Sequence, residues 1–213
     1  MDVLDAIRGR RAIRQFRPEP VSGAALRQLV EAACWAPSAM NGQPWRFVVV
    51  TDESLIAEIS EQSKRWMLEK ESGFPEADRL ANLLREPGIH IFHHAPALVV
   101  IAAPKGARWG IEGCTLAAEN LMLAATSLDL GTCWVGLAEG WLNTEAGRAA
   151  LQLPKDAQVV ASIAVGHPQA VPGPVERRQP AVTWLASEGH FAEDGEAPDY
   201  TPHAGLYGSL IHP

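Results

Sequence analysis

The chain has 213 residues, of which 47% are apolar, and its formal net charge is −7 with an isoelectric point near 5.5. This size predicts one domain with a single core. The negative charge argues against a general binder of nucleic acid or anionic membranes, because both activities need a positive surface field. Residues 1–20 carry no apolar signal-peptide core, and no apolar run is long enough to span a bilayer. We therefore expect a cytoplasmic protein.

The first quarter of the chain predicts two helices and the start of a sheet. Apolar residues at helical spacing predict a short helix over residues 2–9. Ser22 is a candidate N-cap for a second helix, which Pro37 ends. The sequence "WRFVVVTD", residues 45–52, predicts a largely buried strand, and Asp52 is placed to cap a third helix.

Residues 64–94 have no clear period. They mix charged residues with the sequence Gly73-Phe74-Pro75 and with a group of histidines. Such a composition favours a mobile helical excursion or a lid over an element of the core.

The later elements alternate between strand and helix. The patterns predict a buried strand over 97–103, a helix over 111–128 that is buried on most sides, an extended segment over 132–137, a helix over 143–151 and a strand over 158–166. Gly131 is the candidate C-cap of the long helix. Alternation of this kind suggests a parallel sheet with crossover helices, although periodicity alone cannot decide strand direction.

Three cysteines, Cys34, Cys114 and Cys133, each lie in an apolar segment and are not at the spacing of metal ligands. Free cysteine is among the residue types most often buried. We therefore expect all three to be inert thiols in the core.

The strongest local charge lies in "RGRRAIRQFR", residues 8–17, which holds five arginines and no acid. Guanidinium groups bind phosphate through paired, charge-assisted hydrogen bonds, so converging arginines would hold a phosphomonoester. A solvated basic edge explains the same composition equally well. Arg177 and Arg178 form a second basic pair that could close on the same phosphate.

Other common sites lack their signatures. The sequence contains neither a GxGxxG turn after a strand nor a GxxxxGK[ST] loop, so side chains would have to hold a phosphate. The segment "HIFHH", residues 90–94, has the spacing of metal ligands, but no carboxylate or thiolate nearby completes a set. Ser38 has no nucleophile elbow around it and no partnered base. We expect neither a metal nor a catalytic dyad.

Three segments in this order resemble the FMN-dependent nitroreductase family. They are "RRAIRQF" at 10–16, "APSAMNGQPWRF" at 36–47 and "AAENLMLAATSLDLGTCWVGL" at 117–137, with "AVGHP" at 164–168 and "RRQP" at 177–180 closing the pattern. The resemblance covers about residues 1–185, which we expect to form the FMN-binding domain. Residues 186–213 are then a C-terminal tail or an arm that wraps the partner subunit.

The resemblance implies an α+β protein with a nitroreductase-like three-layer fold. Its central sheet would be mainly antiparallel and flanked by helices, which replaces the suggestion of a parallel sheet. The family pattern also implies a homodimer with one FMN in each of two sites at the subunit interface. NADPH or NADH would be the electron donor.

The matching positions imply which residues bind the cofactor. Arg10 and Arg11 would hold the FMN phosphate and ribityl chain, with help from Arg177 or Arg178. Ala12 stands where many members have a serine, so one hydroxyl donor is missing there. Arg14 would lie near the pyrimidine edge, where a fixed positive charge stabilises the negative charge that collects on reduction.

Two further segments complete the implied site. The loop "PSAMNGQ" would reach across the dimer interface to the partner's cofactor, through Pro37, Ser38, Met40, Asn41 and Gln43. Gly136 and Leu137, which follow Val135, would present backbone N–H groups to flavin N5 and O4. No residue is assigned a catalytic role, because the flavin carries the chemistry.

The implied activity is reduction of nitroaromatic, quinone or enone-type small molecules by NAD(P)H in a ping-pong hydride mechanism. Two relatives of the same fold run other chemistry, namely reductive dehalogenation and oxygen-dependent flavin fragmentation. A non-catalytic FMN-binding protein is the alternative from a different class. The motifs do not identify the acceptor.

Overall fold

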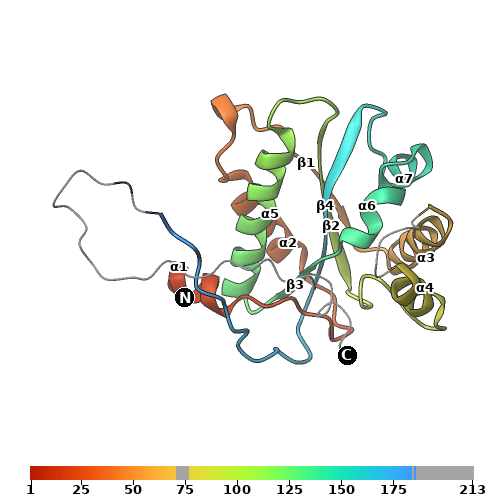
Figure 1. Ribbon diagram of the computed structural model, residues 1–213, viewed down its shortest axis with the longest axis horizontal. Helices are drawn as coiled ribbons and strands as arrows, with labels where there is room; N and C mark the ends of the chain where they lie inside the picture. Colours follow the sequence, from red (N-terminus) through yellow and green to blue (C-terminus); the bar gives the residue numbers. More distant parts are fainter. Residues whose placement is uncertain (71–76, 184, 186–213) are drawn as a thin grey trace. The chain divides into compact units, whose positions relative to one another are not determined.

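The computed structural model describes residues 1–70, 77–183 and 185 (Figure 1). The chain divides into two units, Met1–Pro172 and Gly173–Pro213, and the first contains every helix and strand named below. The expected tail, residues 186–213, lies outside the described residues, and the domain boundary after residue 185 stays a prediction. None of the helices in the described ranges is both long and apolar enough to cross a membrane.

The described part of the first unit contains a four-stranded sheet. Its order is β1-β2-β4-β3, with the strands β1 (Arg46–Val50), β2 (Ala97–Pro104), β3 (Gly131–Trp134) and β4 (Ala157–Gly166). All three pairs of neighbouring strands are antiparallel. The α+β prediction is confirmed, and the suggestion of a parallel sheet is wrong because a periodic pattern reports burial rather than strand direction.

Helices cover both faces of the sheet and make three layers (Figure 1). One face packs against α2 (Gly23–Cys34) and α5 (Gly110–Ser127). The other packs against α3 (Glu53–Lys70), α6 (Glu139–Leu142) and α7 (Glu145–Ala150). Side chains of β2 alternate between the two cores: Leu98 and Val100 face one, and Val99 and Ile101 face the other. All four are fully buried, which explains the uninterrupted apolar run.

The remaining short elements lie outside these layers or at the ends of strands. They are α1 (Val3–Gly9), which packs against α5, α4 (Ala77–Arg85), which packs against α3, and the 3-10 turns η1 (Ala39–Asn41) and η2 (Gly136–Ala138). The predicted helix over 143–151 corresponds to α7, and the preceding α6 was not predicted because its four residues are too few to show a period.

The predicted helix starts are confirmed by their caps. The Ser22 hydroxyl accepts from the Ala25 N–H over 3.1 Å at the start of α2. One Asp52 carboxylate oxygen accepts from the N–H groups of Ser54 and Leu55, over 2.9 and 3.2 Å, at the start of α3. These bonds satisfy donors that the first helical turn leaves without partners.

Gly131 is not the C-cap of α5. The helix ends at Ser127, and Asp129 takes the left-handed backbone conformation with φ 57°. Gly131 instead begins β3, where a Cβ atom would lie only 2.7 Å from Ile13 Cγ1. The glycine is needed for close packing of the arginine segment and not for a turn.

Two other expectations need correction. The interpretation of residues 64–94 as a lid is wrong for the described residues, because Met67, Leu84 and Phe92 belong to the core; residues 71–76 lie outside the described part. Cys34 is exposed because it ends α2 beside a solvent-facing tryptophan, so only Cys114 and Cys133 are buried as expected. Burial raises the pKa of the Cys114 thiol to about 11.

Candidate functional site

The arginine segment forms an extended edge beside β3. Ala12 makes a parallel bridge with Thr132, and the Ile13 N–H donates to the Thr132 carbonyl over 2.9 Å. Further along, the Arg17 N–H donates to the His167 carbonyl over 2.8 Å. Backbone bonds at two points therefore fix the segment that carries Arg10, Arg11 and Arg14.

Apolar side chains of this segment anchor it in the core. Ile13 and Phe16 are buried, whereas Arg10, Arg11 and Arg14 are half-buried. Apolar and basic residues thus take different environments along one extended stretch. The basic side chains are held by the fold of the same protomer.

Arg10 has bonding capacity that the described residues do not use. Its Nε lies 3.4 Å from a carboxylate oxygen of Glu119 on α5, which is close enough for charge attraction. The same Nε is buried and makes no hydrogen bond to any residue in the described ranges. A buried guanidinium nitrogen in that state favours an additional acceptor close by.

Arg11 curls back over the end of α1. One terminal nitrogen donates to the carbonyl of Arg8 over 2.6 Å and to that of Arg10 over 2.9 Å. Carbonyls at a helix C-terminus carry partial negative charge, so they stabilise a cation there. The positive charge of Arg11 is therefore kept close to Arg10.

Arg14 lies near two groups that the sequence did not connect with it. Burial first, and then the Arg14 charge together with His90 and His94, lower the pKa of His93 to about 4. Burial raises the pKa of the Cys133 thiol on β3, and Arg14 opposes this rise. His93 is therefore neutral at pH 7 and borders the arginine site from the turn before β2.

The histidines of "HIFHH" are arranged by an unusual backbone. His93 and His94 both take left-handed conformations, with φ of 56° and 54°. The His90 ring stacks near that of His94, with 4.5 Å between centroids, and its Nδ1 accepts from the Phe92 N–H over 3.2 Å. Across the described residues, no three His, Cys, Asp or Glu side chains gather as a metal site.

The second predicted cofactor segment, residues 37–43, forms a tight projecting loop. Met40, Asn41 and Gln43 all have positive φ, at 53°, 54° and 42°. Inside the loop, the Gln43 N–H donates to the Ser38 hydroxyl over 3.0 Å. Left-handed conformations at three non-glycine residues store strain, which in proteins is found most often at binding sites. Met40 at the tip is 92% exposed.

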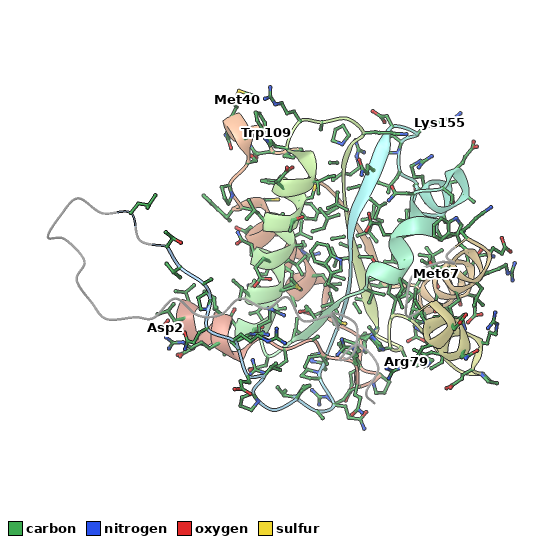
Figure 2. The ribbon with its side chains drawn as sticks, in the orientation of Figure 1. Asp2, Met40, Met67, Arg79, Trp109 and Lys155 are labelled. Carbon is green, nitrogen blue, oxygen red and sulfur yellow. The ribbon has the colours of Figure 1, made fainter. Side chains whose placement is uncertain are left out.

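The loop and the arginines lie at different ends of the α5 layer. Pro44 packs against Gly113 in the first turn of α5, and Figure 2 shows Met40 beside Trp109 at that end, with Asp2 of α1 at the other end. Arg10 follows α1 directly and pairs with Glu119 further along α5. One protomer thus presents the two halves of the predicted site on separated surfaces.

The third predicted segment connects β3 to α6. Val135 is buried, Gly136 is exposed and Leu137 is half-buried. The Val135 N–H donates to the Ser162 carbonyl over 2.8 Å, and the Ser162 hydroxyl donates to the Val135 carbonyl over 2.6 Å. Since Ala12 bridges to Thr132 of β3, the arginine segment lies beside the strand that leads into the Gly136 turn.

Two predicted residues remain to be placed. Arg177 and Arg178 are exposed and belong to the second unit, whose position relative to the first is not determined. Their role at a phosphate stays a prediction.

Sequence reasoning missed three residues that adjoin the site. Glu119 pairs with Arg10, His93 borders Arg14, and Ser162 holds Val135. His93 gave a signal as part of a histidine group that pointed to metal, and Glu119 lies inside the third quoted motif, where it was given no role. Ser162 lies inside an apolar strand, where a single hydroxyl residue gives no warning of a role.

Comparison with known proteins agrees with this geometry. A family model described as "Nitroreductase family" matches residues 7–167. The chain is 29% identical over 172 residues to an Archaeoglobus fulgidus protein whose name includes NAD(P)H nitroreductase, covering 79% of this chain and 86% of that one. It is 30% identical over 200 residues to the nitrobenzene nitroreductase of Ectopseudomonas oleovorans, covering 76% of this chain and 85% of the relative.

Solved structures share the fold. An FMN-bound nitroreductase from Bacteroides fragilis matches 87% of this chain and 100% of its own, with a TM-score of 0.78 and 24% sequence identity. With a family model that covers most of the chain and an antiparallel three-layer fold, the chain belongs to the nitroreductase family.

Proposed function

We propose that this NAD(P)H-dependent flavin oxidoreductase uses FMN to reduce nitroaromatic, quinone or enone-type acceptors in a ping-pong reaction. The single observation that carries the proposal is the arginine edge bonded to β3. Arg10, Arg11 and Arg14, the proposed anion-binding set, belong to the segment that pairs with β3, the strand that leads into the exposed Gly136 turn. A flavin mononucleotide needs both features, one for its phosphate and one for its ring.

The residues present fit FMN. The buried Nε of Arg10 has no hydrogen-bond partner within the described residues, so an acceptor in reach would satisfy it. At Gly136 no described heavy atom lies within 4 Å of the position that a Cβ would take, which leaves room for a planar ring against the backbone. Neutral His93 beside Arg14 leaves the arginine as the main local charge.

Bound FMN supplies hydride transfer, and the chain supplies binding, orientation and electrostatics. Arg10 and Arg11 bind the phosphate and ribityl chain. Arg14 stabilises negative charge at the pyrimidine edge, and the Gly136 and Leu137 N–H groups orient the ring. Nicotinamide and acceptor would occupy the same place in turn, and no protein residue is assigned as an acid or base, because the flavin would carry the chemistry.

The proposed enzyme is a homodimer. Large apolar side chains are exposed on the elements of the α1, α2 and α5 side of the sheet: Val3, Leu4, Ile7, Trp35, Met40, Trp109 and Ile111. Exposed apolar residues in such numbers are typical of a surface that another chain covers. A partner on this side would bring its 37–43 loop to the arginine edge, which the loop of the same chain does not reach.

The test is the visible spectrum of the purified protein before and after anaerobic addition of NADPH, repeated with NADH. We expect a yellow protein that either nucleotide bleaches, and whose colour returns when a nitroaromatic or quinone is added. A yellow protein that neither nucleotide bleaches would contradict the reductase and support a flavin-binding protein without this activity. A colourless protein that takes up no FMN would contradict both.

A further inference from the structure

Ser162 and Val135 form a reciprocal pair across β4 and the end of β3. The Ser162 side chain is 2% exposed, and its hydroxyl donates to the Val135 carbonyl over 2.6 Å. In return, the Ser162 carbonyl accepts from the Val135 N–H over 2.8 Å. Both backbone polar groups of Val135 are therefore held by one residue.

The carbonyl of Val135 shares a peptide unit with the N–H of Gly136. A trans peptide is planar, and its C=O and N–H point in opposite directions. Because the Ser162 hydroxyl draws the carbonyl towards β4, the Gly136 N–H must point away from β4. Gly136 itself is exposed, and no described heavy atom lies within 4 Å of the position that a Cβ would take there.

Without the hydroxyl this peptide has little to fix it. Rotation of the Val135–Gly136 peptide changes only ψ of Val135 and φ of Gly136. Glycine has no Cβ and accepts positive and negative φ about equally. The hydrogen bond from Ser162 is thus the contact that distinguishes the two orientations of the plane.

The same bond also strengthens the N–H as a donor. A hydrogen bond accepted by a carbonyl polarises its amide, and linked hydrogen bonds reinforce one another in a low-dielectric interior. Ser162 therefore acts on both the direction and the strength of the Gly136 N–H.

We propose that Ser162 is a positioning residue whose buried hydroxyl selects the peptide orientation in which the Gly136 N–H faces flavin N5. This inference rests on the proposed function, since it needs FMN at the arginine edge. Ser162 touches no cofactor atom and acts only through the Val135–Gly136 peptide.

The opposite orientation has a defined consequence. It would turn the Val135 carbonyl to flavin N5, where a carbonyl accepts from the N–H of the reduced ring but repels the lone pair of the oxidised ring. Loss of the hydroxyl should therefore weaken binding of oxidised FMN and raise the midpoint potential of the bound cofactor. A purely structural role would weaken the binding of both redox forms alike and leave the midpoint potential unchanged.

The experiment compares Ser162→Ala with Ser63→Ala in the full chain. Ser63 is a matched control because its side chain is also fully buried, and its hydroxyl has no hydrogen-bond partner within the described residues. Ser162→Thr, which keeps a hydroxyl and suits a strand, serves as the rescue variant. Each protein is studied without cofactor and after loading with ¹⁵N-labelled FMN.

In Ser162→Ala without cofactor, we expect the Gly136 amide and Val135 carbonyl NMR signals to shift and the Gly136 amide to exchange faster. In the loaded protein we expect the ¹⁵N signal of flavin N5 to move and the midpoint potential to rise. The dissociation constant of oxidised FMN should increase about fivefold, the scale of one net hydrogen bond. Ser63→Ala should change none of these, and Ser162→Thr should restore them.

Two results overturn the inference and can be told apart. If loaded Ser162→Ala has the N5 signal, potential and FMN affinity of Ser63→Ala, the positioning role is wrong and the proposed function stands. If the wild-type chain takes up no FMN, the proposed function fails and the inference falls with it, whatever the Gly136 amide shows.

Discussion

The two segments proposed to bind the cofactor differ in how the fold holds them. Residues 10–17 are bonded to β3 and to the end of β4, and two of their apolar side chains enter the core. Residues 37–43 are stabilised by bonds within their own loop, with positive φ at three non-glycine residues and an exposed tip. The first segment is built into its own protomer, whereas the second projects from it.

This difference suggests a division of labour between subunits. The backbone of the arginine edge is fixed, because moving it would break its bonds to β3 and to the residue after β4. The loop offers rigid, solvent-facing side chains at the opposite end of the α5 layer, which suits a contact made to another chain. Variants that displace the first segment from β3 should therefore damage stability and cofactor binding together, while variants in the loop should affect mainly the cofactor.

The largest effect is expected from Gly131→Ala. A new Cβ 2.7 Å from Ile13 forces the arginine segment off β3, so the free energy of unfolding should fall by about 1–3 kcal/mol and FMN should be lost. Chemical denaturation and FMN titration measure the two effects. Gly9→Ala is the control, because no described atom crowds that position. Unchanged stability in Gly131→Ala would show that this segment is not held by packing.

The next largest loss of FMN binding is expected from Arg11→Ala. Loss of a charged hydrogen bond to the phosphate should weaken FMN binding by about 2 kcal/mol, roughly thirtyfold. Equilibrium dialysis against FMN gives the constant. Arg17→Ala is the control, because it removes an arginine from the same segment. Among the described residues, the only ion pair lost with Arg17 is an exposed one with Glu19, 3.8 Å away, so this variant should bind FMN normally. Equal losses in both variants would mean that general positive charge, not Arg11, holds the cofactor.

Ser38→Ala probes the loop and should have a smaller effect. It removes the hydroxyl that accepts from the Gln43 N–H. That hydrogen bond contributes about 0.5–1.5 kcal/mol to the free energy that keeps the loop ordered. FMN affinity should fall severalfold while thermal unfolding changes little. Ser127→Ala, which removes another local hydroxyl-to-backbone bond, is the control. A large drop in stability without loss of FMN would contradict the division between the two segments.

The last prediction concerns pH. The folded pKa of His93 is lowered to about 4 from its ordinary 6.5, so the unfolded chain binds a proton that the folded chain refuses. Stability from this group is complete above pH 6.5 and is lost as pH falls towards 4. Denaturation curves across that range should show a weaker decline in His93→Gln. An identical decline in both proteins would mean that His93 does not contribute.

Local signals in the sequence predicted much of the fold. Ser22 and Asp52 cap helices as expected, because capping depends on a few neighbouring residues. Strand direction could not be predicted. β2 and β4 are buried on both faces, so their apolar pattern is the same for a parallel and an antiparallel strand. Gly131 and Cys34 were misjudged because their surroundings come from distant residues, or from solvent, which no local pattern records.

The site was predictable where a motif is contiguous and hidden where contacts are long-range. The three motif segments contain every cofactor residue proposed for the first unit. His93 and Ser162 lie outside these segments, in the turn before β2 and in β4. Glu119 lies within the third segment, but its partner Arg10 is distant in the sequence. A hydroxyl inside an apolar strand shows its purpose only when its partner, here the Val135 carbonyl, is known.

The central claim is that each site combines the arginine edge of one protomer with the 37–43 loop of the other. It is tested by mixing two variants that each fail to bind FMN, Arg11→Glu and Ser38→Glu, after unfolding and refolding them together. Half of the dimers would then be mixed, each with one intact site, so about a quarter of the wild-type FMN binding should return. No return of binding, or a monomeric wild type that keeps its FMN, would contradict the claim.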